Sequence, residues 1–358
     1  MSQEKTVTLK NRMGNFLSLR LRPYRPGDEE GMIACIRDEY GETYFKTALY
    51  DPGYIRMEAE EGVITFLVAE TEKDGIAGMM ILKQFLPVET MCEIASQIFR
   101  KKYRGYGLAM SFFQYGMEIL LSKSYSAAFC LPVVFHDVTQ RLLYRLGLRA
   151  TGFMLNVFDM DGITHSYQNG RNGKHSQGIQ VRAVEKKDAG VLYLPEEHRL
   201  FCELIYDRLE VKYRMAEEMP EEPDGLPERS IVVCKNDERQ HSMEIRIPQV
   251  GADLKEQLRM VHSRYPLEGK QTANILLNCN DLHAVWAYDL LKKEGYFFTG
   301  LKPLCSDMEF MVLHHPGKVK IYFSDYVVSE EFARLLRYIR SCYENRADLQ
   351  ELNSESGV

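Results

Sequence analysis

Apolar and polar residues alternate, or recur at helical spacing, along most of the chain, and this pattern predicts mixed helices and strands. Residues 16–22 alternate apolar with polar or basic side chains, as a half-buried strand does. Asp51 followed by Pro52 is typical of a helix N-cap with proline at the first helical position. In the first half we expect helices at 32–40, 52–60, 108–121 and 139–146, and strands at 16–22, 64–70, 76–82, 91–99, 127–134 and 151–159.

The second half repeats part of this order. The pattern predicts strands at 179–184, 231–235, 243–247, 273–277, 297–301 and 309–313, and helices at 196–209, 254–262, 283–294 and 329–343. Residues 217–228 are acidic, contain three prolines and predict a loop. Because strands and helices follow one another in the same order as in the later part of the first half, we expect two domains of similar architecture.

These elements predict an α/β (α+β) fold in which a mixed central sheet is flanked by helices. Residues 166–178 are rich in Gly, Asn and Ser, which indicates an interdomain linker. The expected domain borders follow from this linker. They are a flexible N-terminus at 1–15, a first domain at 16–165, the linker at 166–178, a second domain at 179–316, and a C-terminal helix and tail at 317–358.

Composition narrows the classes of protein that this chain can be. With 358 residues, 45% hydrophobic and 11% aromatic, the chain has enough apolar mass for a core, which excludes disorder throughout. A net charge of −6 disfavours a general nucleic-acid binder. No segment is apolar enough for a signal peptide or a membrane span. The eight cysteines are widely spaced, so we expect no metal site, no disulfide framework, and a cytoplasmic location.

Residues 100–109 combine basic residues and glycines in a pattern typical of an anion site. After the strand predicted to end at Phe99, the sequence Arg-Lys-Lys-Tyr-Arg-Gly-Tyr-Gly-Leu-Ala reaches Ala109 and opens a helix. Gly105 and Gly107 allow the backbone to adopt positive φ and to approach a ligand closely. The first amides of the helix add hydrogen-bond donors and the positive end of the helix dipole. The segment therefore predicts an anion site, although a plain strand–turn–helix with a solvated basic edge fits the same pattern.

The residues Arg104-Gly105-Tyr106-Gly107-Leu108-Ala109 resemble the Gln/Arg-x-x-Gly-x-Gly/Ala signature of the GNAT acetyltransferase superfamily. The context is also similar, since the signature follows a strand, opens a helix and precedes a helix ending in Leu146-Gly147-Leu148. This resemblance covers about residues 16–165. It implies that acetyl-CoA is the co-substrate, with its pyrophosphate on the amides of residues 105–109. The pantetheine arm would lie near Gln97, Ile98 and Phe99.

The resemblance also implies catalytic roles for two residues. Glu93 lies at the offset where this family places a glutamate base, and a carboxylate there could take the proton from an amine acceptor. Glu93 could equally be a solvent-facing strand residue, and Glu89 is a weaker candidate. Tyr144 is the nearest tyrosine to the family's proton donor, but it lies one residue beyond the usual position, which Leu143 occupies. Core packing is the alternative for Tyr144. His136 could cap its helix, contact a substrate or act as a base, and capping is the expected role.

The second domain resembles a degenerate copy of the first. Its comparable junction, residues 247–254, contains one glycine and no arginine, and Asp253 would repel a phosphate. We therefore expect no coenzyme there. The whole chain is predicted to be an acyl-CoA-dependent N-acyltransferase, a monomer or homodimer, that acts on a small-molecule or peptide amine. The alternative is a non-catalytic acyl-CoA sensor or regulatory interaction module.

Overall fold

A computed structural model describes residues 4–85, 88–123, 125–161, 173–184, 188–217, 225–305 and 308–355. Contacts divide the chain into two compact units, which are described separately. Unit 1 comprises Met1–Cys130 and Asp161–Arg171, and unit 2 comprises Leu131–Met160 and Asn172–Val358. The units follow contacts in space rather than sequence order, so the domain borders expected at 165 and 179 stay a prediction.

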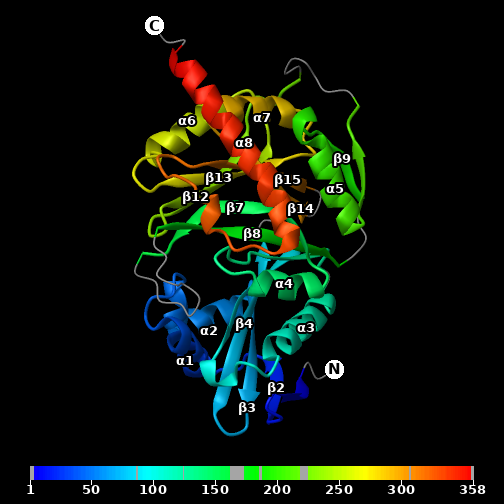
Figure 1. Ribbon diagram of the computed structural model, residues 1–358, viewed down its shortest axis with the longest axis vertical. Helices are drawn as coiled ribbons and strands as arrows, with labels where there is room; N and C mark the ends of the chain where they lie inside the picture. Colours follow the sequence, from blue (N-terminus) through cyan, green and yellow to red (C-terminus); the bar gives the residue numbers. More distant parts are fainter. Residues whose placement is uncertain are drawn as a thin grey trace. The chain divides into compact units, whose positions relative to one another are not determined.

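Unit 1 is a sheet in the order β1-β2-β3-β4-β5-β6, with helices on both faces (Figure 1). Its elements are β1 (Lys5–Lys10), β2 (Phe16–Pro23), α1 (Glu29–Tyr40), η1 (Thr47–Tyr50), α2 (Pro52–Glu61), β3 (Ile64–Thr71), β4 (Gly75–Phe85), β5 (Val88–Phe99), η2 (Lys101–Tyr103), α3 (Leu108–Leu121) and β6 (Ala127–Cys130). The strand pairs from β1 to β5 are antiparallel, whereas β5 and β6 run parallel.

Side-chain alternation along the strands explains why helices cover both faces of this sheet. Phe66, Val68 and Met79 point to one face, where they form a buried core with Met32 and Ile36 of α1. Their neighbours Leu67 and Met80 point to the other face. There Gly116 of α3 lies so close that a Cβ atom would be 2.7 Å from the Met80 sulfur and 3.7 Å from Leu67.

Most predicted elements of this half are confirmed, and two differences are informative. The Asp51 side chain accepts from the Gly53 amide at 2.8 Å, so the predicted N-cap of α2 is confirmed. The N-terminus differs from the expected flexible segment, because residues 5–10 form β1 and pair with β2. Its alternating pattern is weak because Lys and Thr occupy an exposed edge strand. The strand expected at 127–134 is shorter and ends at Cys130.

The hydrogen-bonded strands of unit 2 follow the order β8-β7-β14-β15-β13-β12-β11, and β9 and β10 form a separate parallel pair. Its elements are α4 (Val138–Arg145), β7 (Arg149–Asp159), β8 (Lys174–Ala183), β9 (Asp188–Leu192), η3 (Glu196–His198), α5 (Arg199–Leu209), β10 (Lys212–Met215), β11 (Ile231–Asp237), β12 (Ser242–Gln249), α6 (Leu254–Arg264), β13 (Thr272–Asn278), α7 (Ala284–Lys293), β14 (Phe297–Cys305), β15 (Met308–His315), η4 (Phe323–Asp325) and α8 (Glu330–Glu355).

The same order of elements occurs twice in the chain. The segment β5-α3-β6-α4-β7-β8 is repeated as β12-α6-β13-α7-β14-β15. In both copies the first two strands are parallel and the last two form an antiparallel pair. The mixed α/β architecture and the repeated order agree with the expectation from sequence.

The predicted linker needs a correction at its C-terminal end. Residues 166–172 lie outside the described residues, but Lys174 to Gly178 form the beginning of β8. Gly178 is needed there because the Phe332 ring of α8 packs directly on the strand, and a Cβ atom would lie 2.4 Å from its Cζ. A glycine that indicates a linker in the sequence therefore provides a packing surface for a helix.

Strands β7 and β14 touch each other through two glycines. Gly152 and Gly300 are Cα partners, and a Cβ atom built on Gly300 would lie 2.3 Å from the Gly152 Cα. The Thr151 hydroxyl donates to the Leu301 carbonyl at 2.8 Å beside this contact. The two backbones thus meet without side chains between them.

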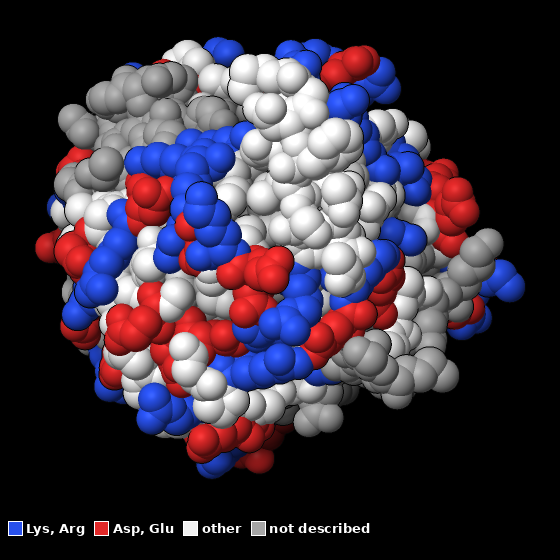
Figure 2. All heavy atoms as spheres, turned by 90° about the horizontal axis from the view of Figure 1, so that it is seen from below, with Lys and Arg blue, Asp and Glu red and all other residues white. Residues whose placement is uncertain are grey.

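The surface carries charges of both signs. On the face that Figure 2 shows, Lys and Arg side chains are interspersed with Asp and Glu side chains. Exposed ion pairs such as Lys5–Glu118 at 2.6 Å and Arg37–Glu42 at 2.7 Å stabilise the fold little, because water screens them. Among the described helices, none combines the length and the apolar character that a bilayer span needs. The cysteines with described side chains are free thiols.

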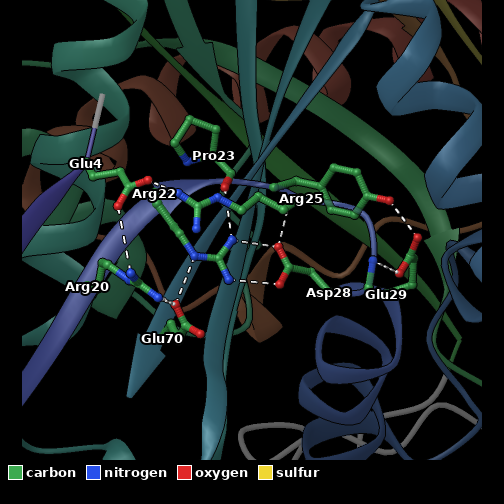
Figure 3. A network of polar contacts seen from close by, with 10 residues as sticks. Glu4, Arg20, Arg22, Pro23, Arg25, Asp28, Glu29 and Glu70 are labelled. Carbon is green, nitrogen blue, oxygen red and sulfur yellow. Dashed lines mark hydrogen bonds and ion pairs between the residues drawn. The ribbon is translucent and has the colours of Figure 1, made fainter. Parts of the chain in front are cut away.

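A buried arginine of β2 stabilises the turn between β2 and α1 (Figure 3). Arg22 of β2 is 3% exposed and donates to both carboxylate oxygens of Asp28, at 2.7 and 2.8 Å. Its Nε donates to Glu70 of β3 at 2.9 Å. Arg20, which is half exposed, also donates to Glu70. Arg22 therefore joins two strands to the residue that precedes α1.

We expect Arg22→Met to lower the free energy of unfolding by about 3 kcal/mol or more, because Asp28 and Glu70 would lose a buried partner. Arg20→Gln is the matched control on the same strand and should cost about 1 kcal/mol or less, since its pair with Glu70 is exposed. Urea unfolding of both variants measures the difference. Equal losses of unfolding free energy in the two variants would show that the burial of Arg22 adds nothing to stability.

A second carboxylate beside this network makes stability depend on pH. Burial raises the pKa of Glu29, but hydrogen bonds from the Tyr24 hydroxyl, from its own backbone, from Arg56 and from the Gly27 amide outweigh burial and lower the pKa to about 2. The Tyr24 bond is 2.6 Å and the Gly27 bond 2.7 Å. The charged form of Glu29 therefore stabilises the fold above its ordinary value of 4.5.

We expect Glu29→Gln to reduce stability at pH 7, and the difference from the unmodified chain to shrink as pH falls from 4.5 toward 2. The sign follows because a carboxylate with a lowered pKa in the folded state loses its contribution on protonation. Urea midpoints measured across this pH range provide the check. A difference that stays constant with pH would contradict the assignment.

Candidate functional site

The corner between β5 and α3 has the backbone shape expected from its two glycines. Gly105 has φ 86° and Gly107, the N-cap of α3, has φ 75°. Residues with a side chain rarely adopt these positive φ angles, whereas glycine does so without strain. A Cβ atom on either glycine would meet no atom within 4 Å. Both glycines therefore border open space.

The backbone amides at this corner are available as donors. Met110 and Ser111 donate to the Gly107 carbonyl, at 3.2 and 3.4 Å, and begin the helix ladder. Among the hydrogen bonds of the described residues, none is donated by the amides of residues 105–109. No side chain caps this end of α3. Free first-turn amides and the helix dipole together favour an anion at this position.

The cations beside the corner are partly committed to other partners. Arg104 pairs with Glu39 of α1, a side chain that is only 5% exposed. Lys102 pairs with Asp74 at 2.9 Å. Lys101 is exposed, and Arg100 is half-buried. The sequence correctly locates these charges, but it does not show that Arg104 and Lys102 are already paired.

The end of β5 is fixed to the start of α3. Gln97 donates through Nε2 to the Ala109 carbonyl at 2.9 Å. Ile98 is buried in the core shared with α1. The Phe99 ring packs against Phe112, with centroids 5.7 Å apart, and covers Gly78. These three side chains are occupied in structural contacts, so any ligand beside this strand would meet their backbone.

A bulge interrupts β5 before that point. Ser96 has φ 48°, and the pairing with β4 shifts between Ala95 and Ile98, so β5 carries one extra residue there. The Ser96 hydroxyl is held by the Tyr44 hydroxyl at 3.0 Å and by the Lys46 ammonium at 3.2 Å. These contacts stabilise a backbone conformation that a serine rarely adopts.

The sheet of unit 1 opens beside Glu93. Strand β6 pairs with β5 at Met91, Cys92 and Glu93, and these pairs end at Glu93 and Phe129. Beyond Glu93, β5 continues to Phe99 with β4 as its partner. Within the described part of unit 1, the other edge of residues 94–99 therefore faces no strand. The region near Gln97 to Phe99 is where the resemblance places the pantetheine arm.

Glu93 lies at this opening with its carboxylate unengaged. The residue is half-buried, and among the described residues no hydrogen bond or ion pair involves its carboxylate. The Tyr44 hydroxyl and the Cys130 thiol lie within electrostatic range of Glu93. Burial, with Glu93 as an additional cause, raises the pKa of the Tyr44 hydroxyl and of the Cys130 thiol. A group that approached the Glu93 carboxylate would therefore displace none of the ion pairs formed by the described residues.

Tyr144 belongs to unit 2 and so lies in the other unit from Glu93. It occupies the penultimate position of α4 and is 50% exposed, with the Arg149 guanidinium 4.7 Å above its ring. Its neighbour Leu143 points into the core. The alternative of core packing for Tyr144 is therefore wrong, whereas its role as proton donor stays a prediction. The expectation for His136 is also wrong, since the N-cap of α4 is Asp137.

The corresponding corner of unit 2 is filled by the chain itself. The amides of Val250, Gly251 and Ala252 donate to Asp281, Ser230 and Pro227, at 2.8 to 2.9 Å. Asp253 accepts from the Ser230 amide at 2.6 Å. A Cβ atom on Gly251 would lie 2.3 Å from the Arg229 carbonyl carbon. Unlike the corner at 105–109, this one leaves no room for a ligand.

No family model matches the sequence, and no curated protein matches it. Many solved structures match the chain, and acetyltransferases that cover about half of it are among them. An N-acetyltransferase from Staphylococcus aureus Mu50 is 14% identical, with 47% of this chain and 99% of that chain covered and a TM-score of 0.37.

Two further matches are similar in extent. A structure described as an acetyltransferase of the GNAT family from Desulfovibrio desulfuricans is 13% identical, covers 47% of this chain and 99% of its own, and has a TM-score of 0.38. A spermidine/spermine N-acetyltransferase from Vibrio cholerae is 13% identical, and the match covers 47% of this chain and 94% of that chain with a TM-score of 0.38. At these values the likeness assigns no activity to this chain.

The sequence does not identify the residues that support the bulge in β5. Tyr44, Lys46 and Ser96 support the bulge, yet none belongs to a motif, and Ser96 is an ordinary strand residue by composition. The cluster of aromatic residues between Tyr40 and Tyr50 is the one signal that the sequence offers for a role of this segment. That signal does not indicate which strand the segment contacts.

Proposed function

We propose that unit 1 binds an acyl-coenzyme A and transfers its acyl group to an amine. The observation that carries this proposal is the corner at 105–109, where successive amides have no acceptor among the described residues and two glycines border open space. A pyrophosphate offers several anionic oxygens to such a row of donors. At the corresponding corner of unit 2, by contrast, the chain's own groups accept from the amides of residues 250–252.

The bound coenzyme would supply an acyl thioester, the electrophile of the reaction. Glu93 would accept a proton from the ammonium form of the acceptor, because only the neutral amine can attack. The nitrogen–carbon bond then forms, the carbon–sulfur bond breaks, and the free thiol leaves with one proton. Backbone amides of residues 94–99 on the unpaired edge of β5 are the candidate donors to the oxyanion.

The remaining assignments stay predictions. Gln97, Ile98 and Phe99 are predicted to present backbone groups to the pantetheine arm, and Arg104 to lie near the phosphates. Tyr144 is predicted to protonate the departing thiolate. Acetyl-CoA is the expected donor, and the acceptor is an amine of a small molecule or a peptide.

Gly107→Glu should abolish coenzyme binding, because a carboxylate would enter the anion site. Gly62→Glu is a matched control, since Gly62 also has positive φ, 77°, and open space around it, but caps the end of α2. Both variants carry the same backbone strain and the same added charge. Titration calorimetry with acetyl-CoA should detect binding to the control alone. Binding to the Gly107→Glu variant with unchanged affinity would remove the corner assignment.

Glu93→Gln should leave coenzyme affinity unchanged and lower turnover by about 10²- to 10⁴-fold, as loss of a general base does. Glu118→Gln is the control, because Glu118 is an exposed residue of α3. Thiol release from acetyl-CoA with a panel of amines measures turnover. Equal rates in the two variants would contradict the role of Glu93. Coenzyme binding without thiol release for any amine would instead indicate the acyl-CoA sensor.

A further inference from the structure

A separate cavity of about 520 Å³ lies within unit 2, lined by residues of α4, β7, the end of α5 and the start of α8. This volume lies in the range of small-ligand sites. Four arginines line the cavity, together with Tyr144 and the first residues of α8. They are Arg141 of α4, Arg149 of β7, Arg208 of α5 and Arg334 of α8.

The walls of this cavity are held by buried polar groups. Gln140 of α4 is fully buried, and its Oε1 accepts from the Ser329 amide at 2.8 Å. Its Nε2 donates to the carbonyls of Val133 and His136, at 2.9 and 3.0 Å. Glu331 of α8 accepts from the Ala150 amide at 3.1 Å. These bonds fix α4 and β7 against the start of α8, so the cavity is preformed rather than created by a ligand.

Two of the four arginines that line the cavity pair with a carboxylate, and two do not. Arg141 pairs with Asp137 at 3.1 Å, and Arg334 pairs with Glu330 at 3.0 Å. Among the described residues, Arg149 and Arg208 form no ion pair. The remaining acid is Glu331, which lies within electrostatic range of both. The lining therefore carries one more positive than negative charge at neutral pH.

Arg149 is held in a fixed orientation. Its Nη1 donates to the carbonyls of Tyr144 and Leu148, each at 3.2 Å. Its guanidinium carbon lies over the exposed Tyr144 ring, 4.7 Å from the ring centroid. Because these contacts use only Nη1, the other nitrogens remain available. A guanidinium oriented in this way can bind the two oxygens of a carboxylate or phosphate side by side.

We propose that this cavity binds a small organic anion through a carboxylate or phosphate group, with Arg149 and Arg208 as the principal ligands. Tyr144 orients Arg149 and forms part of the wall. The site belongs to unit 2 and does not depend on coenzyme binding at the corner of unit 1. It gives Tyr144 a role that would persist if thiolate protonation were disproved.

The test uses the full chain carrying Gly107→Glu, so that phosphate cannot occupy the corner at 105–109. Inorganic phosphate and citrate are titrated separately by calorimetry, which distinguishes a preference for phosphate from one for carboxylates. We expect at least one of them to bind with a stoichiometry of one. Adding Arg208→Gln should weaken this binding by about tenfold or more, as loss of a charge-assisted hydrogen bond does. Adding Arg149→Gln should give a similar loss.

Arg337→Gln is the matched control, because Arg337 is exposed on the same helix as Arg334 and is not among the residues that line the cavity. It should leave the affinity within about twofold. The proposal is overturned if neither anion binds up to about 10 mM, a limit that already corresponds to very weak affinity. It is also overturned if Arg337→Gln weakens binding as much as Arg208→Gln and Arg149→Gln do. Far-UV circular dichroism verifies that each variant is folded.

Discussion

Backbone amides at the start of a helix lack partners within the helix, and this constraint distinguishes the two copies of the repeated fold. In unit 2 the chain satisfies it internally, because Pro227, Ser230 and Asp281 accept from the amides that precede α6. In unit 1 the amides of residues 105–109 keep their capacity to donate. The two corners have the same place in the order of elements. Their difference in chemistry follows from segment 227–230 and Asp281, which together fill the second corner.

The proposed reaction centre depends on a related feature of β5. This strand loses its neighbour β6 after Glu93 while β4 continues beside it. A bulge at Ser96, held by Tyr44 and Lys46, changes the direction of the strand over the same residues. A half-buried carboxylate and an unpaired strand edge therefore occur together. The anion corner begins a few residues further along the same segment, so one continuous stretch of chain carries every group that the proposal assigns to unit 1.

The sequence predicts features that depend on neighbouring residues better than features that depend on distant ones. The N-cap at Asp51, the bounds of α3 and the positive φ angles at Gly105 and Gly107 follow from local rules and are confirmed. Strand β1 was not expected, because a polar edge strand has a weak pattern, and the short parallel pair β9 and β10 was not expected either. The pair between Arg104 and Glu39 joins residues 65 positions apart, and no local pattern indicates it. The same holds for the arginines around Tyr144, which come from four separate elements.

The contact between Gly152 and Gly300 has a consequence for how this molecule can vary. Two main chains that touch directly cannot slide past each other by one residue, since Thr151 or Leu301 would then bring a side chain into a space that holds none. Even one added methyl group would clash with the facing backbone and push β7 and β14 apart. The register between β7 and β14 is therefore fixed by the lack of space for a side chain rather than by a ladder of hydrogen bonds. A substitution at either glycine would be tolerated only if both strands moved apart together.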